Sequence, residues 1–370
     1  MPDASSINLF LCGDVMTGRG IDQILPYPSN PVLHEPYVKD AREYVKLAER
    51  VNGTIPRSVE FSYIWGNALS ELNCFLPDLR LINLETSITT SDEYWKGKGI
   101  NYRMNPANID CLTAASIDYC SIANNHVLDW GYSGFEETIE TLRKANISFS
   151  GAGENVQQAE SPAILDIKER GRVLIYSFGS ITSGAPSEWA ASTSRAGINL
   201  LEEKSFKTIK KQITAEKRTH DVVVFSVHWG ANWGYDISFE QQDLAHRLIQ
   251  DADVDVVWGH SSHHVKGFEV YNGKLILYGC GDFLNDYEGI DGYEEFRTDL
   301  SLMYFVKVKT ITGRLRSLKM IPTQVKRFKI NPAQKTDAFL LYEILNREGK
   351  EFASNVELSE QDGFNLLWKQ

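Results

Sequence analysis

The sequence predicts an α/β protein. Short apolar runs rich in β-branched and aromatic residues recur along the chain, and amphipathic helical patterns separate them. The runs are continuously apolar rather than alternating, which is typical of strands covered on both faces. With 370 residues, of which 42% are hydrophobic and 24% charged, the chain is long enough to bury a core without disulfides or a structural metal.

Seven runs predict strands and four patterns predict helices. The strands are expected at 7–12, 79–84, 119–123, 173–178, 222–227, 254–258 and 275–278. The helices are expected at 107–116, 133–145, 202–217 and 238–251. In the last of these, Leu244, Ala245, Leu248 and Ile249 share one helix face, so this helix is expected to pack on the sheet.

Two regions interrupt the alternation of strands and helices. Residues 26–78 combine proline, tyrosine and charge and predict an insertion with one or two helices, whereas residues 89–106 predict a long loop. The C-terminal part predicts two antiparallel strands and a polar helix, at 302–308, 315–321 and 335–346. We expect one domain over 1–325, with a helical extension over 326–370 packed on it.

Charge and cysteine content restrict the class of protein. The chain carries 38 basic and 49 acidic residues, a net charge of -11, which disfavours a protein that coats nucleic acid or an anionic membrane. No run approaches the ~18 apolar residues of a membrane span, and the N-terminus lacks the pattern of a signal peptide. The five cysteines are scattered without a CxxC pair. These observations predict a cytoplasmic protein with neither nucleic-acid nor membrane partners.

Residues with metal-binding side chains follow six of the predicted strands. They are Asp14, Glu85, Asn124–Asn125–His126, His228, His260–Ser261–Ser262–His263–His264 and Asp282. Ligands of α/β sheets bind at the carboxyl ends of the strands, so these side chains are expected to meet at one edge. The mixed oxygen and nitrogen set suits Mn, Fe or Zn better than Ca and exceeds one tetrahedral site. It therefore predicts two divalent metal ions, a pair that generates hydroxide and clamps a phosphoryl group.

Each of these residues also has an ordinary structural interpretation. Asp14 alone is a turn or helix-capping residue, and Asn124–Asn125 alone is a turn. His228 alone is a hydrogen-bonded core histidine. The recurrence of such residues at six equivalent positions favours a site over six separate coincidences.

The ordered motifs resemble those of the metallo-dependent phosphatase superfamily, and most closely its bacterial capsule-synthesis branch, the CapA-like (poly-γ-glutamate biosynthesis) proteins. The motifs are GDVMTGR at 13–19, NLE at 83–85, ANNHVLDWG at 123–131, HWG at 228–230 and GHSSH at 259–263. Together they cover roughly residues 7–285.

The resemblance implies a four-layer α/β/β/α sandwich with a dinuclear metal centre. It implies that Glu85 bridges the metals, that Asp14 and His263 complete one site, and that Asn125, His228 and His260 complete the other. His263 is favoured over His264 by spacing. His126 would protonate the leaving-group oxygen or stabilise the developing negative charge.

Two departures from the wider superfamily affect the metal sites. Met16 stands where the superfamily has histidine, which removes one nitrogen ligand, and the bridging acid Glu85 is one methylene longer than aspartate. The capsule-synthesis branch shares the methionine. The first metal site is therefore expected to be weak, water-rich or empty.

An anionic substrate needs local positive charge in a chain of this net charge. Besides the metals, Arg19 and Arg103 are candidates for a bidentate contact to phosphate or carboxylate, with a surface position as the alternative. Asp282 is a candidate substrate contact or a turn residue. Aromatic residues of the two irregular regions form either a recognition wall or packing onto the core; they are Tyr27, Tyr37, Trp65 and Trp95.

Three functions follow from this set. The first is a metal-dependent hydrolase of phosphoesterase type acting on an anionic small molecule or polymer. The second, from the resemblance, is an enzyme of poly-γ-glutamate synthesis or processing. The third is a non-catalytic metal-binding or scaffold protein with a degraded centre.

Overall fold

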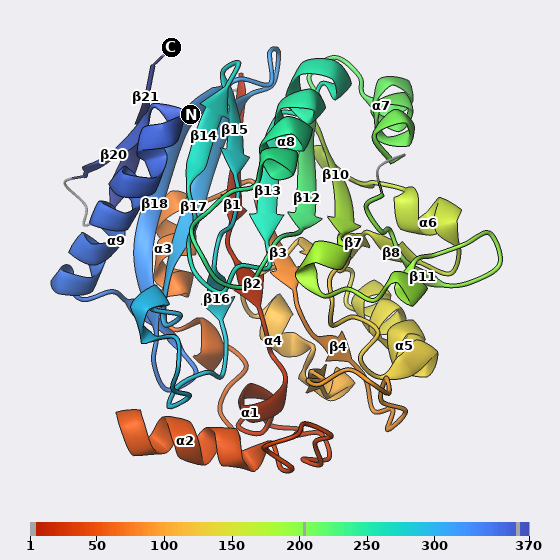
Figure 1. Ribbon diagram of the computed structural model, residues 1–370, viewed down its shortest axis with the longest axis vertical. Helices are drawn as coiled ribbons and strands as arrows, with labels where there is room; N and C mark the ends of the chain where they lie inside the picture. The colour runs from red at the N-terminus through yellow and green to blue at the C-terminus, as the bar shows by residue number, and fades with distance from the viewer. Residues whose placement is uncertain (1–4, 203–204, 360–362, 370) are drawn as a thin grey trace.

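The computed structural model describes residues 5–202, 205–359 and 363–369. It is a mixed α/β protein with two large mixed sheets, flanked by helices (Figure 1). The predicted α/β class is therefore confirmed. All seven predicted strands are present, with ends that differ by a few residues from the expected ones.

The larger sheet contains the strands that carry Asp14 and Glu85. Its main path runs β16-β2-β3-β1-β17-β18-β21-β20; β6 pairs with β3 and β7, and β19 pairs with β18. The strands around β3 are parallel, and β17 and β18 are antiparallel as predicted. The bounds are β1 Ser6–Leu11, β2 Asp14–Val15, β3 Leu79–Leu84, β6 Tyr119–Ser121, β7 Ser148–Ser150, β16 Asp282–Leu284, β17 Leu300–Lys309, β18 Leu315–Val325, β19 Ile330–Pro332, β20 Ser354–Leu358 and β21 Phe364–Trp368.

The second sheet carries His228 and His260 at the ends of two of its strands. Its order is β14-β15-β13-β12-β10-β9, with β10, β12, β13 and β15 parallel and β9 and β14 antiparallel at the edges. The bounds are β9 Ala163–Ile167, β10 Gly171–Gly179, β12 Val222–His228, β13 Val256–His260, β14 Phe268–Tyr271 and β15 Lys274–Leu277. Two short pairs accompany the sheets, β4 Ser87–Ile88 with β5 Arg103–Met104, and β8 Ala152–Gly153 with β11 Gly197–Ile198.

Helices cover the sheets and fill the insertion. The insertion 26–78 contains α2, η1 and α3, and the C-terminal helix α9 is followed by β20 and β21, which the sequence did not predict. The bounds are α1 Arg19–Asp22, α2 Arg42–Asn52, η1 Tyr63–Trp65, α3 Ala68–Phe75, η2 Pro106–Asn108, α4 Asp110–Thr113, α5 Gly131–Lys144, α6 Val156–Glu160, η3 Ile181–Ser183, η4 Ser187–Trp189, α7 Ser205–Glu216, α8 Phe239–Ala252, η5 Glu294–Phe296, α9 Lys335–Gly349 and η6 Lys350–Phe352. Within the described ranges, no helix combines the length and the apolar character that a bilayer crossing requires.

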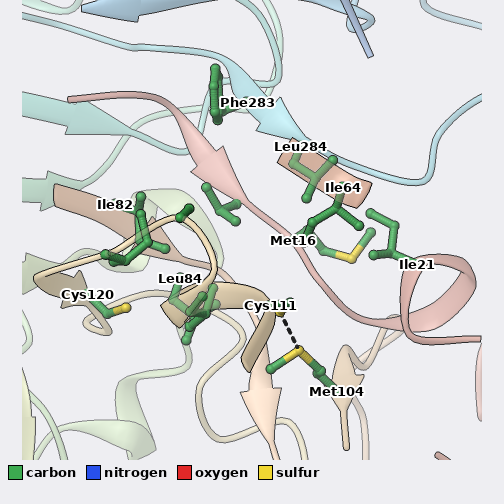
Figure 2. Packing of buried hydrophobic residues seen from close by; sticks show 14 of the residues in the cluster. Met16, Ile21, Ile64, Ile82, Leu84, Met104, Cys111, Cys120, Phe283 and Leu284 are labelled. Carbon is green, nitrogen blue, oxygen red and sulfur yellow. Dashed lines mark hydrogen bonds between the residues drawn. The ribbon is translucent and has the colours of Figure 1, made fainter. Parts of the chain in front are cut away.

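Both faces of the strands are buried, which explains the continuous apolar runs. On β1, Leu9 packs in a cluster that includes β10, β12 and β13, whereas its neighbour Phe10 faces the opposite cluster. On β12, Val224 joins the first of these clusters, and Val223 packs against α7 and α8. The cluster containing Phe10 extends to Met16, Ile82, Leu84 and Phe283 around the end of the larger sheet (Figure 2).

Strand register brings the polar strand ends together. Asp14 pairs with Asn83 on one side and with Asp282 on the other, and His228 pairs with His260. A glycine is required before Asp14, because a Cβ at Gly13 would collide with the backbone carbonyl oxygen of Gly281. This close approach allows the backbone N–H of Asp14 to donate to that same oxygen at 2.9 Å. The site is therefore assembled by sheet pairing rather than by flexible loops.

Candidate metal centre

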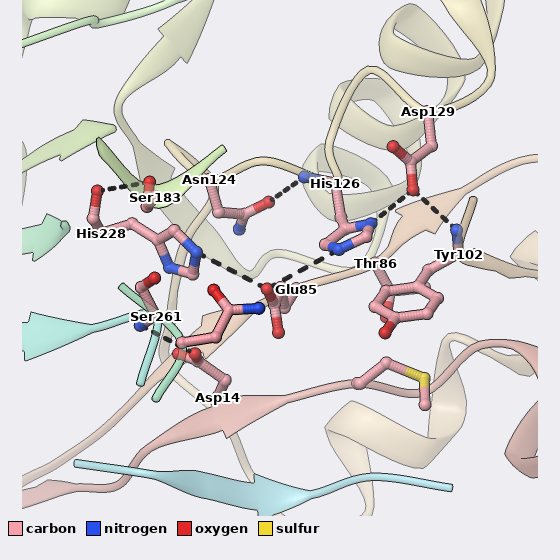
Figure 3. Close-up of polar contacts among 12 residues, drawn as sticks. Asp14, Glu85, Thr86, Tyr102, Asn124, His126, Asp129, Ser183, His228 and Ser261 are labelled. Atoms are coloured by element: carbon pink, nitrogen blue, oxygen red, sulfur yellow. Dashed lines mark hydrogen bonds and ion pairs between the residues drawn. The ribbon is translucent and has the colours of Figure 1, made fainter. Parts of the chain in front are cut away.

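Asp14, Glu85 and His228 form a buried cluster with the geometry of a metal site. Each offers one ligand atom, and the three atoms lie within 4.8 Å of one another (Figure 3). His228 Nε2 is 3.5 Å from Glu85 Oε1. Asp14 lies on β2 and Glu85 directly follows β3, both in the larger sheet. His228 ends β12 of the second sheet.

The residues of this cluster fit a divalent cation. His228 Nε2 is buried and has no hydrogen-bond partner within the described part of the chain, a state that costs free energy unless something binds it. Two carboxylates and one imidazole are a ligand set suited to a transition metal. A cation held here would give His228 Nε2 a partner and offset the repulsion between the two buried carboxylates.

Burial decides the protonation of the three side chains. Burial lowers the pKa of His228 to about 3, so its imidazole is neutral at neutral pH. Burial alone would raise the pKa of Asp14, but the hydrogen bond to His260 and the nearby histidines lower it to about 2. Burial raises the pKa of Glu85 well above its usual value, and the charges of Asp14 and Asp282 add to the effect. A neutral imidazole is the form of histidine that ligates a metal.

Asn83 connects the members of the cluster, and the sequence analysis did not assign it a role. Its Nδ2 donates to Asp14 Oδ1 at 2.7 Å and lies 3.3 Å from His228 Nδ1. Its Oδ1 accepts from Asn124 Nδ2 at 3.2 Å. The available signal was an amide inside the otherwise apolar run LRLINL, where a buried polar group needs partners.

His260 lies beside Asp14 of the same cluster; the motifs assign it, together with Asn125 and His228, to one metal. His260 Nδ1 is 3.1 Å from Asp14 Oδ1, and its Nε2 is 3.1 Å from Ser226 Oγ. Asn125 Oδ1 is buried, and no residue that the structure describes forms a hydrogen bond with it. Asn124, by contrast, is hydrogen-bonded and accepts from the backbone N–H of His126 at 3.0 Å. The assignment of His260 and Asn125 to a second metal stays a prediction.

His263 and His264 point to different surroundings. His263 Nδ1 is 3.1 Å from both carboxylate oxygens of Asp282, and its Nε2 is 2.9 Å from Asn232 Nδ2. Burial opposes protonation of His263, but the charge of Asp282 outweighs it and raises the pKa. His264 stacks on Phe296, and its Nδ1 lies 3.1 Å from the carbonyl oxygen of Val265. The role of His263 as a metal ligand, and of Asp282 as a substrate contact, stays a prediction.

His126, the predicted catalytic residue, stands beside Glu85. Its Nε2 is 3.8 Å from Glu85 Oε1, and its Nδ1 is 2.6 Å from Asp129 Oδ2. The ring stacks on Tyr102 with centroids 3.9 Å apart. Burial lowers the pKa of His126 to about 4, so the ring is neutral at neutral pH. An Nδ1–H donated to Asp129 leaves Nε2 free to accept a proton.

Lys98 is a second residue that the sequence analysis missed. Its Nζ pairs with Asp129 and lies 2.9 Å from His126 Nδ1. Burial lowers the pKa of Lys98, although Asp129 opposes this effect. Lys98 belongs to the loop 89–106, where neither periodicity nor spacing marks one lysine above another.

The two predicted substrate arginines are bound within the protein. Arg19 pairs with Asp286 and, at 3.1 Å, with Glu35, and its guanidinium stacks on Tyr44 at 3.9 Å. Arg103 Nη1 binds Asp92 at 2.8 Å, and the guanidinium lies 3.8 Å above the Trp130 ring. Both side chains are buried, so a substrate contact by either stays a prediction.

Met16 and the aromatic candidates occupy different environments. Met16 is buried in the hydrophobic cluster, and its Sδ is 3.1 Å from the backbone nitrogen of Gly18. Trp65 is fully buried and donates from Nε1 to the Cys111 carbonyl oxygen at 2.6 Å, so it packs in the core. Trp95 packs edge-on against Trp189, with ring centroids 5.5 Å apart. The side chains of Tyr27 and Tyr37 are exposed.

Comparison with known proteins agrees with the motifs at this centre. The family model described as bacterial capsule synthesis protein PGA_cap matches residues 8–287. The chain is 43% identical over 354 residues, 95% of this chain and 93% of the relative, to a probable polyglutamine synthesis accessory protein of Mycobacterium tuberculosis.

Two relatives from Bacillus are more distant. The PGA biosynthesis protein CapA of Bacillus subtilis is 29% identical over 63% of this chain and 58% of that protein. The capsule biosynthesis protein CapA of Bacillus anthracis is 23% identical over 76% of this chain and 60% of that protein. The resemblance drawn from the motifs is therefore confirmed, and the chain belongs to the bacterial capsule-synthesis (PGA_cap) family.

Proposed function

We propose that this protein takes part in the synthesis or processing of an anionic polymer of the poly-γ-glutamate type, and that it acts through a divalent metal bound at Asp14, Glu85 and His228. The names of two relatives, a probable polyglutamine synthesis accessory protein and a PGA biosynthesis protein, support the substrate class. The observation that carries the metal assignment is the buried Nε2 of His228, which lies 3.5 Å from Glu85 Oε1 and has no hydrogen-bond partner among the described residues.

Two divalent ions would complete the proposed centre, with Mn, Fe or Zn as the metals: Asp14 and His263 would hold one, Asn125, His228 and His260 would hold the other, and Glu85 would serve both. The buried Oδ1 of Asn125, which has no hydrogen-bond partner among the described residues, supports the second set. In this proposal the two sheets and their helices form the four-layer α/β/β/α sandwich implied by the motifs, with support from the hydrophobic clusters on both faces of β1 and β12.

The proposed chemistry is acyl or phosphoryl transfer to water or to another nucleophile. A bound divalent cation supplies Lewis-acid polarisation of a substrate oxygen. Burial lowers the pKa of His126 to about 4 and keeps the ring neutral, so Nε2 would accept a proton from the attacking nucleophile and pass it to the leaving-group oxygen. Asp129 holds the ring through Nδ1 and compensates the charge that His126 acquires. The stack on Tyr102 keeps the ring plane fixed.

Hydrolysis of a phosphoester is the second candidate. The observation that favours it is the position of His126, whose Nε2 lies 3.8 Å from the proposed metal ligand Glu85. An oxygen leaving group at that position needs a proton donor. A scaffold role without catalysis is the third, and it predicts metal without turnover.

The test measures metal content and polymer length on the same preparation. Protein reconstituted with Mn is analysed by elemental analysis and incubated with γ-linked glutamate oligomers, whose lengths are read by mass spectrometry. We expect one to two equivalents of metal, the lower value if the site that lacks a histidine at position 16 stays empty, and a change in oligomer length that His126→Asn abolishes. A parallel panel of phosphomonoesters and phosphodiesters tests the second candidate. Bound metal with no turnover in either panel refutes both enzymatic functions.

A further inference from the structure

Lys98 places a positive charge at the edge of the metal centre. Its Nζ contacts Asp129 and His126, and its side chain remains 13% exposed, so solvent reaches it. Arg19 and Arg103, the other cations considered for a substrate, are already bound to carboxylates of the protein.

The loop that carries Lys98 is anchored at both ends to one residue. The backbone N–H of Trp95 donates to the Asp129 carbonyl oxygen at 2.7 Å, and that of Tyr102 donates to Asp129 Oδ2 at 2.6 Å. Between these anchors the tip 96–100 is exposed except for Lys98. A Cβ built on Gly97 or Gly99 would meet no heavy atom within 4 Å. The tip therefore stands clear of the body, and the Lys98 side chain ties it down.

The contacts of Lys98 use only part of the hydrogen-bonding capacity of its ammonium group. His126 Nδ1 lies 2.6 Å from an Asp129 oxygen and 2.9 Å from Lys98 Nζ, but a neutral ring nitrogen either donates or accepts. When His126 Nδ1 donates to Asp129, it offers no lone pair to Lys98. Of these two contacts, Asp129 is then the one that still accepts from Lys98. Beside Lys98, 5.3 Å from its Nζ, lies the ring of Trp189, whose buried Nε1 has no hydrogen-bond partner among the described residues. An ammonium that keeps unused donors and remains partly exposed to solvent can bind an anion.

We propose that Lys98 is the anion-binding residue of this site: it exchanges Asp129 for a carboxylate of the substrate and draws the tip 96–100 onto it. The identity of that anion as a polymer carboxylate rests on the proposed function, since a phosphate offers the same chemistry. The Asp129 carboxylate keeps its contacts to His126 and to the Tyr102 backbone when Lys98 leaves.

The test is equilibrium binding rather than turnover. Calorimetric titrations use the Mn-loaded full chain with γ-linked glutamate tetramer in one arm and inorganic phosphate in the other. The variants are Lys98→Met, Lys98→Arg and the matched control Lys96→Met, which removes the same charge from an exposed residue of the same tip. Metal affinity and thermal unfolding are measured for each variant.

We expect Lys98→Met to weaken binding about tenfold or more, as loss of a charge-assisted hydrogen bond does, with unchanged metal affinity. Lys98→Arg is expected to retain most of the binding, and Lys96→Met to change it less than twofold. Equal losses in Lys98→Met and Lys96→Met, or no loss in either, overturn the proposal. If the wild type binds phosphate but not the tetramer, and Lys98→Met does not bind phosphate, then the anion site at Lys98 is supported and the polymer function is refuted. If the wild type binds neither ligand, both the anion site and the polymer function are refuted.

Discussion

Replacing Asp286 by asparagine tests whether the buried cluster around Arg19 is a structural support. Arg19 and Asp286 have side chains 2% and 0% exposed, and Arg19 Nε donates to Asp286 Oδ2 at 3.2 Å in addition to the Nη2 contact. Asp286→Asn keeps the shape but leaves the guanidinium with one charged partner, Glu35 at 3.1 Å.

Removing one partner of a buried pair costs about 3–5 kcal/mol. Because Glu35 remains, we expect about 3 kcal/mol, measured as the change in unfolding free energy by urea denaturation. The matched control Glu35→Gln leaves the bidentate contact to Asp286 and is expected to lose about 1–2 kcal/mol. A loss below about 1 kcal/mol for Asp286→Asn refutes the reasoning, because it means that water or another anion already compensates Arg19. The guanidinium would then be available to a substrate, as the sequence analysis predicted.

Four further predictions follow from the centre and its supports. Asp14→Asn, Glu85→Gln and His228→Ala are each expected to weaken Mn binding at least about tenfold by calorimetry, and unchanged affinity in all three contradicts the site. His228 and His126 have folded-state pKa values of about 3 and 4, below the ~6.5 of an unfolded histidine, so the unfolded chain takes up protons first as the pH falls. The contribution of these two histidines to metal-free stability should therefore be complete above pH ~6.5 and decline toward pH ~4 by up to ~1.4 kcal/mol per pH unit for each, whereas the raised pKa values of His263 and Glu85 contribute with the opposite sign; a urea profile that His126→Asn leaves unchanged opposes this. Asp129→Asn is expected to lower turnover about 10²-fold or more with unchanged metal content, and equal activity excludes a role in holding His126. Gly13→Ala, whose Cβ meets the Gly281 backbone, is expected to cost more than about 3 kcal/mol or to prevent folding, whereas Gly99→Ala, with open space around it, is expected to change stability by less than about 1 kcal/mol.

The central strands were predictable because burial on both faces leaves a continuous apolar run, as in VVVFSV of β12. The edge strands were not. In β9, AILDI, the side chains alternate between buried and exposed, and β20, SNVEL, has a polar outer face, so neither forms such a run. Their pairing with β10 and β21 is set by tertiary contacts that a local pattern does not encode.

The site was predictable as far as residue type and strand position decide it. Asp14 and Glu85 follow neighbouring parallel strands of the larger sheet, and His228 ends a parallel strand of the second sheet, positions that a sequence of alternating strands and helices already indicates. The partners of the cations were not predictable, because Arg19 binds Asp286 from 267 positions away. Lys98 and Asp129 are 31 positions apart, and a loop of irregular backbone brings them together.

The candidate ligands are divided between the two sheets: Asp14 lies on β2, whereas His228 and His260 end β12 and β13. Neither sheet contains the centre alone, and β1, which leads into β2, pairs with β17, near residue 300. During synthesis the centre is therefore completed only after most of the chain has emerged and the two sheets have docked. A metal bound at the proposed centre would then link the two sheets, and metal retention would report that the whole fold, rather than either half, has formed.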